Sequence, residues 1–171
     1  MHNKFLLLPL IVLLTSCGFH LRGYNNTDYK FPFNSVFVKC QNVVICSNLE
    51  TMIKTHDLAI IESQEDKAEA VILLYNEQTS RDIQSFNAAG RISAYLMTYQ
   101  VQAKVFEHNV QLGNQINVSV NGTLQYNDAT ILSNNQGEAD LWNTLHNNAT
   151  NQLVRKIIFS NSFRKINNES K

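Results

Sequence analysis

Hydrophobic and polar residues alternate most regularly in the second half of the chain. Apolar or aromatic side chains occupy every second position through most of Ile92–Glu107, and the pattern returns over Ile116–Tyr126. Because successive side chains of a strand point to opposite faces, each run predicts a half-buried strand. A turn at 87–90 and a loop containing Gly113 and Asn114 imply antiparallel hairpins. The predicted buried faces are Tyr95, Met97, Tyr99, Val101, Ala103 and Val105 in the first run, and Ile116, Val118, Val120, Leu124 and Tyr126 in the second.

Two further strands are expected earlier in the chain. The β-branched and aromatic run Val36–Val38 predicts a first strand, and the apolar run that begins at Val71 predicts a second one continuing toward Phe86. The short apolar run 58–61 fits a strand or a helix equally well. The charged and polar segment 63–69 predicts a solvated connection.

Two segments carry helical spacing of apolar residues. Ser47 with Glu50 three residues later is typical of a capping box, and the helix that it opens is expected to end near 56–57. Asn135 with Glu138 resembles a second capping box, which opens a helix that ends near Phe159. The apolar stripe of this second helix is Leu141, Trp142, Leu145, Ala149, Leu153, Val154, Ile157 and Ile158.

These elements predict an α+β fold: a mainly antiparallel or mixed four-stranded sheet with two helices packed on one face. The folded domain is expected over 35–160, with a tether over 17–34 before it and a flexible tail over 161–171 after it. A single domain of this size buries roughly 68–70% of its unfolded surface, which suffices for a core.

The N-terminal 16 residues have the features of an export signal. A short start containing Lys4 precedes an apolar run over Phe5–Leu14. As a helix, this run would cover roughly 15 Å of a hydrocarbon core roughly 30 Å thick, so it is too short to span a bilayer. The sequence therefore predicts a signal peptide over 1–16.

The residues that end this signal resemble a lipobox. Leu14-Thr15-Ser16-Cys17 places a branched apolar residue three positions before a cysteine and small residues directly before it. The Cys17 thiol would carry diacylglycerol, and the freed amino group an acyl chain such as palmitate. Gly18, rather than Asp, after the cysteine favours the outer membrane. The alternative is a chance cysteine behind an ordinary signal or a short membrane anchor.

Charge and cysteine content narrow the function classes. Lys4 is the single charged residue of 1–16, so cleavage would leave 13 basic and 14 acidic residues and a formal charge of −1. This balance argues against a nucleic-acid partner. Cys40 and Cys46 could form a disulfide in an oxidising compartment or remain buried and unpaired. Their spacing matches no zinc pattern, and no metal or cofactor is expected.

Three segments resemble a known family. The string Cys-Gly-Phe-His-Leu-Arg over Cys17–Arg22 is characteristic of the LPS-assembly lipoprotein LptE (RlpB) family, and Ser93–Met97 and Asn151–Lys156 are similar in position and sequence. The resemblance implies a small sheet with two helices on one face. It also implies a lipoprotein that sits inside the lumen of the β-barrel LptD, assists assembly of that barrel and takes part in lipopolysaccharide transport.

Candidate contact residues follow from this role. A lipopolysaccharide site should present cations beside apolar surface, and the candidates are Arg81, Arg91, Lys104 and Phe86. The uncharged polar face of the last strand suits the wet, polar lumen of a barrel. The alternation taken by itself favours an ordinary solvated face, and only the family resemblance favours an interface. The candidate barrel contacts are Arg22, Asn117, Ser119, Asn121, Thr123 and Gln125.

Two other classes of function stay open. A periplasmic hydrolase would need a catalytic constellation, but the sequence has no Gly-x-Ser-x-Gly elbow and no His-Glu-x-x-His motif. Its histidines are scattered over different elements, so a non-enzymatic role is favoured. A generic scaffold lipoprotein anchored to the outer membrane is the remaining alternative.

Overall fold

The computed structural model describes residues 30–41, 43–127, 129, 131–160 and 163, with the side chains of 131–133 left undescribed. The strands are β1 (Ser35–Cys40), β2 (Ile60–Ile61), β3 (Ala70–Phe86), β4 (Ile92–Glu107) and β5 (Val110–Gln125). The helices are α2 (Cys46–Thr55), the short 3-10 helix η1 (Glu65–Lys67) and α3 (Ile131–Phe159).

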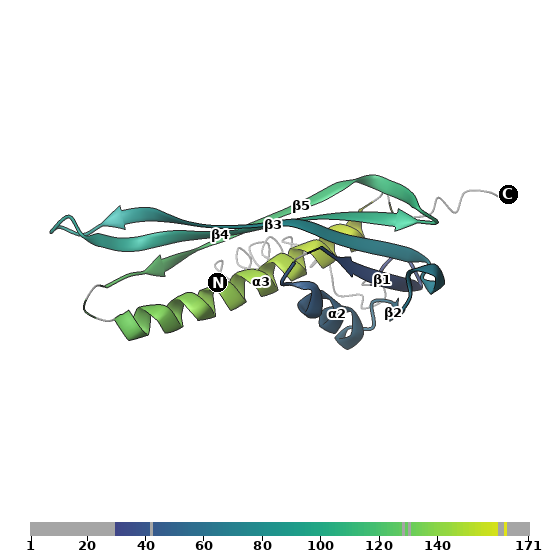
Figure 1. Ribbon diagram of the computed structural model, residues 1–171, viewed down its shortest axis with the longest axis horizontal. Coiled ribbons are helices and arrows are strands. Elements are labelled where there is room, and N and C mark those ends of the chain that lie inside the picture. Colours follow the sequence, from purple (N-terminus) through teal and green to yellow (C-terminus); the bar gives the residue numbers. More distant parts are fainter. Residues whose placement is uncertain (1–29, 42, 128, 130, 161–162, 164–171) are drawn as a thin grey trace, which may run out of the picture.

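One mixed sheet joins all five strands in the order β2-β1-β3-β4-β5. β3, β4 and β5 pair antiparallel, whereas β1 pairs parallel with both β2 and β3. Figure 1 shows α2 and α3 on the same side of this sheet, so the predicted α+β fold with two helices on one face is confirmed.

The predicted number of strands was one too low. The additional strand, β2, is only two residues long, and it resolves the ambiguous run 58–61 as an edge strand beside β1. Two residues are too few to show a period, so the alternation of the sequence could not reveal this strand.

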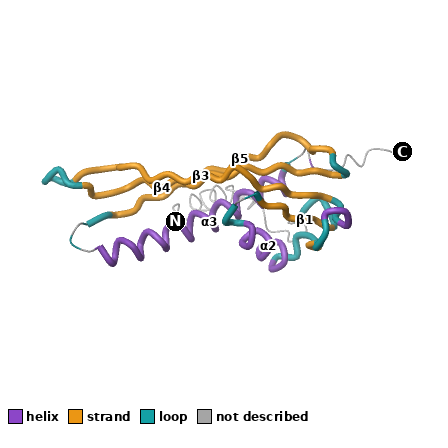
Figure 2. The backbone as a smooth tube through the Cα atoms, in the orientation of Figure 1, coloured by secondary structure: helices purple, strands orange, loops and turns teal. Residues whose placement is uncertain are grey.

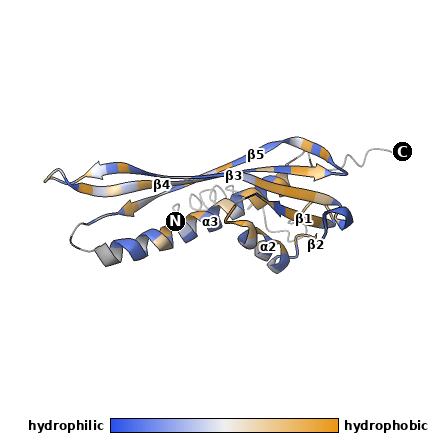
Figure 3. Ribbon diagram, in the orientation of Figure 1, coloured by the Kyte–Doolittle hydropathy of each residue, from blue (hydrophilic) through white to orange (hydrophobic). Residues whose placement is uncertain are grey.

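The core lies between the sheet and the two helices. The faces predicted for β4 and β5 are confirmed: Met97, Tyr99 and Val101 are at most 1% exposed. They contribute to one hydrophobic cluster with residues of β1, β3 and both helices. Figure 3 shows hydrophobic residues concentrated over β1 and the adjoining part of β3.

The folded domain extends beyond the predicted limits at both ends. Phe31 and Phe33, expected in the tether, are buried in the core, and Phe163, expected in the flexible tail, is buried as well. Burial of a Phe side chain is favourable by about 1.5–3 kcal/mol, which explains why these flanking residues pack against the domain. The predicted signal peptide, over 1–16, lies outside the described residues.

The β4–β5 turn lies earlier than predicted. His108 and Asn109 have φ values of 49° and 65°, and they form the two-residue connection between the strands. Two residues with positive φ match the twist of antiparallel strands, which favours this turn. Gly113, predicted in the loop, instead lies within β5 near an irregularity in the pairing with β4. The predicted turn at 87–90 is confirmed.

Neither predicted capping box forms. α2 begins at Cys46, and its N-cap residue Ile45 makes no side-chain cap hydrogen bond, so Ser47 falls inside the first turn. Ile45 is fully buried, and a disulfide joins Cys46 to Cys40 at the end of β1, with the Cα atoms 6.4 Å apart. These two constraints account for the start of α2.

The second helix also starts earlier than predicted, at Ile131 rather than near Asn135. The Asn134 side chain donates a hydrogen bond to the Asn127 carbonyl at 2.7 Å, which holds the β5–α3 connection against the first turn. Glu138, the predicted capping partner, lies well inside the helix and pairs with Arg81 of β3.

Candidate functional site

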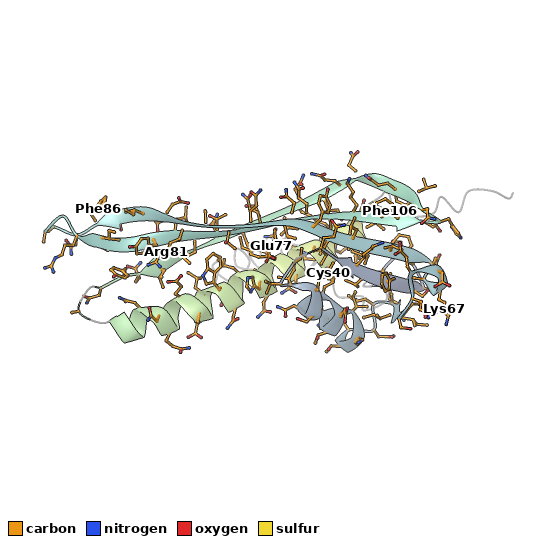
Figure 4. The ribbon with its side chains drawn as sticks, in the orientation of Figure 1. Cys40, Lys67, Glu77, Arg81, Phe86 and Phe106 are labelled. Atoms are coloured by element: carbon orange, nitrogen blue, oxygen red, sulfur yellow. A yellow bond between two sulfur atoms is a disulfide. The ribbon has the colours of Figure 1, made fainter. Side chains whose placement is uncertain are left out.

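The β3–β4 hairpin ends in an exposed tip, defined here as residues 83–91. Ile83 and Phe86 are 52% and 61% exposed. Figure 4 shows Phe86 at the end of the molecule remote from Lys67, and Figure 2 shows that the loops around α2 lie in the other half of the molecule, away from this tip. The tip therefore offers an apolar surface away from the core.

The turn at the tip is closed by backbone hydrogen bonds between Asn87 and both Gly90 and Arg91, and by the Asn87 side chain. The Asn87 Oδ1 atom accepts hydrogen bonds from the backbone N–H groups of Ala89 and Arg91, both at 3.0 Å. Gly90 has a φ of 74°, which glycine adopts without strain. The exposed Arg91 follows directly, so a cation and the apolar Phe86 share the tip.

Arg81 lies further back along β3, on the face covered by α3. Its Nη1 atom lies 2.8 Å from the Glu138 Oε2 atom, and its guanidinium lies 3.9 Å from the centroid of the Tyr95 ring. This exposed ion pair contributes about 0.2–1 kcal/mol, and the ring contact about 0.5–1 kcal/mol. The charge of Arg81 is therefore already shared with a carboxylate.

A bulge in β3 explains why Arg81 faces α3. Asn76 has a φ of 52°, and the pairing with β4 shifts between Tyr75 and Gln78. The additional residue exchanges the faces of the positions that follow, up to the next irregularity after Ile83, so Arg81 stands opposite the buried Met97.

Lys104, the remaining candidate cation, is far from the tip. It pairs with Leu73, whereas the tip residue Phe86 pairs with Ile92. Lys104 lies twelve positions after Ile92 in β4, which corresponds to about 40 Å. Its Nζ atom lies 5.3 Å from the Tyr75 ring. The structure therefore brings Phe86 and Arg91 together at the tip. Arg81 lies about 17 Å from Phe86 along β3, and Lys104 does not belong to the same site.

The five predicted polar side chains of β5 are all exposed. They are Asn117, Ser119, Asn121, Thr123 and Gln125, and they lie on the face opposite the buried Val118 and Val120. β5 is also the last strand of the sheet, so one of its edges pairs with no other strand among the described residues. The side chains of α3 run beside this edge.

A groove follows the boundary between β5 and α3. One section, of about 440 Å³, is lined by Ser119, Val120, Asn121, Asn148, Asn151, Gln152 and Arg155. A second section, of similar volume, is lined by Asn114, Gln115, Ile116, Asn117, Lys156, Ser160 and Phe163. The Lys156 Nζ atom donates a hydrogen bond to the backbone carbonyl of Asn117. We call both sections together the β5–α3 groove.

Polar side chains also meet in the interior, below the sheet. Tyr99 and His146 have ring centroids 4.7 Å apart. The Tyr99 hydroxyl is buried and makes no hydrogen bond within the described part of the chain. Burial raises the pKa of Tyr99, and the nearby Glu77 raises it further; burial lowers the pKa of His146, which Glu77 partly opposes. Glu77 also accepts the Val44 N–H at 3.0 Å, so it links β3 to the segment before α2.

No metal centre is formed by the residues described, since they contain no cluster of three or more His, Cys, Asp or Glu side chains able to hold an ion. Similarly, none of the described helices is long and apolar enough to cross a membrane. The predicted lipid-attachment residue Cys17 and the predicted barrel contact Arg22 lie outside the described residues.

Several contact residues were missed by the sequence analysis. Glu138 was interpreted as a helix cap and Lys156 was assigned no contact, although they contact Arg81 and Asn117 across the fold. Separations of 57 and 39 residues leave no local signal for these contacts. The Asn87 side-chain turn, in contrast, has a local signal, because Asn favours such turns.

A family model described as "LptE: Lipopolysaccharide-assembly" matches residues 41–157. The match includes α2, the whole β3–β4 hairpin, β5 and nearly all of α3. A comparison with curated protein sequences gave no match.

Three solved structures have a similar fold. An uncharacterized lipoprotein B from Nitrosomonas europaea is 27% identical, with a TM-score of 0.69, over 82% of this chain and 90% of that one. A minor lipoprotein from Acinetobacter baumannii is 16% identical, with a TM-score of 0.60, over 74% and 91% of the two chains. The rare lipoprotein B from Shewanella oneidensis is 12% identical, with a TM-score of 0.61, over 72% and 92%. The last two similarities concern the fold alone.

Proposed function

This chain belongs to the LptE family of lipopolysaccharide-assembly proteins, and from that membership we propose that it is a non-enzymatic outer-membrane lipoprotein. It binds inside the LptD β-barrel, assists assembly of that barrel and takes part in moving lipopolysaccharide to the outer leaflet. The single observation that carries the proposal is the family match, because it covers the hairpin, β5 and most of α3 together.

The exposed face of β5 supports contact with a barrel lumen. The interior of an outer-membrane barrel is polar and hydrated, so it suits a surface of uncharged hydrogen-bonding groups. The row Asn117, Ser119, Asn121, Thr123 and Gln125 supplies such groups without a charge that must be desolvated. Arg22 is proposed as a further contact near the lipidated terminus.

Removal of this polar row is expected to release the barrel. In the triple variant Ser119→Ala, Asn121→Ala, Thr123→Ala, each lost hydrogen bond should cost about 0.5–1.5 kcal/mol, so the barrel should bind at least about tenfold more weakly. The measurement is affinity purification of the detergent-solubilised protein, with quantification of the barrel recovered.

A matched control is available on α2, where Ser47, Thr51 and Thr55 form an exposed row of uncharged polar side chains. Their replacement by alanine should leave recovery of the barrel unchanged. Recovery of the wild-type protein without any large β-barrel would refute the proposed partnership, and equal losses in the two triple variants would refute this interface.

The hairpin tip is the proposed contact for lipopolysaccharide. This lipid carries phosphates beside acyl chains, and an exposed Phe86 next to Arg91 can contact both kinds of group. For Arg81 a phosphate would compete with Glu138, whose carboxylate lies 2.8 Å from the guanidinium. Lys104 is given no part in this site because of its separation from the tip.

The double variant Arg81→Ala, Arg91→Ala is expected to bind lipopolysaccharide about two- to thirtyfold more weakly, if each exposed charge contributes about 0.2–1 kcal/mol. Photo-crosslinking from position 86 and titration with purified lipopolysaccharide would measure the loss. The control removes two exposed lysines outside the hairpin, Lys54→Ala on α2 and Lys67→Ala in η1.

Glu138→Gln separates the two roles of Arg81. If Arg81 binds phosphate, loss of the competing carboxylate should strengthen binding, whereas a purely structural ion pair predicts no gain. A double variant that binds as tightly as wild type would reject the tip as the lipid contact.

A further inference from the structure

The free edge of β5 differs from the edges that proteins usually leave uncovered. Natural edge strands are protected by Lys, Pro, short length or bulges, because unpaired backbone groups are a template for another strand. β5 spans 16 residues, and Val110–Gln125 contains no charged residue and no proline. Its pairing with β4 is regular from Ile116 to Gln125, so this part of the edge also lacks a bulge.

Two hydrogen bonds establish which backbone groups point to the free edge. Tyr126 donates its N–H to the Ser93 carbonyl of the neighbouring chain segment, so even-numbered positions face β4 in this regular antiparallel register. The Asn117 carbonyl instead receives the Lys156 side chain, as expected for an odd-numbered position facing outward. The N–H and C=O groups of Ser119, Asn121 and Thr123 therefore point away from β4, toward the free edge beside the β5–α3 groove.

The groove beside this edge favours a negatively charged occupant. Its lining residues include Arg155 and Lys156 and no acidic side chain in either section. The flank contributed by α3 is otherwise made of amides, at Asn148, Asn151 and Gln152. An occupant that brings a carboxylate would be favoured by the two cations, and one that brings Lys or Arg would be opposed.

We propose that the β5–α3 groove binds an extended segment of a partner protein, which adds to the sheet as a further strand beside β5 and places an acidic side chain near Arg155 and Lys156. Main-chain hydrogen bonds supply the affinity in this mode of recognition, and the cations supply specificity. A lipid phosphate could meet the cations but would leave most of the alternating N–H and C=O groups unpaired. A second copy of this chain would bring its own Arg155 and Lys156 and its own α3 to the same flank.

This inference goes beyond the lipopolysaccharide role. It concerns the backbone edge of β5 and the α3 flank, whereas the barrel proposal concerns the polar side chains of β5 and the lipid proposal concerns the hairpin tip. Loss of tip binding would leave the groove intact, and an empty groove would leave the tip intact.

The test uses the full-length mature chain in detergent and a short acetylated peptide that alternates Val and Thr and carries one Glu. Residue-resolved amide hydrogen exchange is measured with and without the peptide. The amides of Ser119, Asn121 and Thr123 should exchange at least about tenfold more slowly at saturation, because each gains a main-chain hydrogen bond. The amides of Val118 and Val120, which already face β4, should change little.

Two matched controls address the backbone and the charge. The same peptide with alternate amides N-methylated keeps its side chains but cannot complete the ladder, so it should give no protection. The double variant Arg155→Gln, Lys156→Gln should bind the Glu peptide about two- to thirtyfold more weakly than the wild-type protein does. The variant and the wild-type protein should bind a peptide with Gln in place of Glu about equally. Thermal unfolding of the variant verifies that its fold is retained.

Four outcomes would overturn the inference: no protection at saturating peptide, equal binding of the N-methylated peptide, protection by lipopolysaccharide but not by peptide, or protection without peptide that grows with protein concentration. The last of these would assign the edge to a second copy of the chain.

Discussion

Replacement of Cys17 by alanine is expected to abolish acylation and to release the protein from the outer membrane. Attachment by acyl chains contributes about 0.8 kcal/mol per buried CH₂ group, and stable anchoring takes more than one chain. Without the thiol, no diacylglycerol can be attached, and the maturation that frees the amino group for palmitate would also fail. Because no described helix is able to span a bilayer, the described part of the chain offers no helical anchor in its place.

The measurement is incorporation of labelled palmitate together with fractionation of membranes on a density gradient. The double variant Cys40→Ala, Cys46→Ala is the matched control, because it removes two cysteines and a disulfide but leaves the proposed attachment residue. Unchanged membrane association of Cys17→Ala would instead support an ordinary signal or a short membrane anchor over 1–16.

Leu153→Ala is expected to have the largest effect on stability, a loss of about 2–5 kcal/mol in the free energy of unfolding. Leu153 is 0% exposed and belongs to the cluster that joins α3 to the sheet. Truncation to alanine removes buried methyl groups and leaves a cavity whose lining loses contacts on one side. A typical domain is stable by only about 5–15 kcal/mol, so this loss would be a large fraction of the total.

Urea unfolding monitored by circular dichroism would measure the loss. The neighbouring Gln152→Ala is the control, because Gln152 is exposed, and its free energy of unfolding should change by no more than about 0.5 kcal/mol. A Leu153→Ala protein as stable as the control would show that α3 contributes little to the core.

The alternation of apolar and polar residues was the most informative signal in the sequence. It gave the buried faces of β4 and β5 correctly because one face of each strand packs against α3, which forces every second residue to be apolar. The alternation could not predict β2, because two residues are too few to show it. It also placed the β4–β5 turn at Gly113, since nothing in the residue types of His108 and Asn109 outweighed a Gly-Asn pair.

The candidate site was less predictable than the fold. The bulge at Asn76 determines whether Arg81 or Asp82 faces α3, and a single Asn within a strand is too weak a signal to predict a bulge. The partners of Arg81 and Asn117 come from α3, far along the chain. The exposure of the polar row on β5 was predictable from the alternation. The direction of its backbone N–H and C=O groups was not, because it depends on the register with β4.

The length of β4 fixes how far the two ends of the molecule stand apart. Its 16 residues extend over about 50 Å, well beyond a hydrocarbon core of about 30 Å. The described chain begins beside Leu58, where Phe31 donates its N–H, at the end remote from the tip. If β4 lies along the axis of a barrel, the hairpin tip and the end of the sheet near Leu58 would thus lie on opposite sides of the membrane.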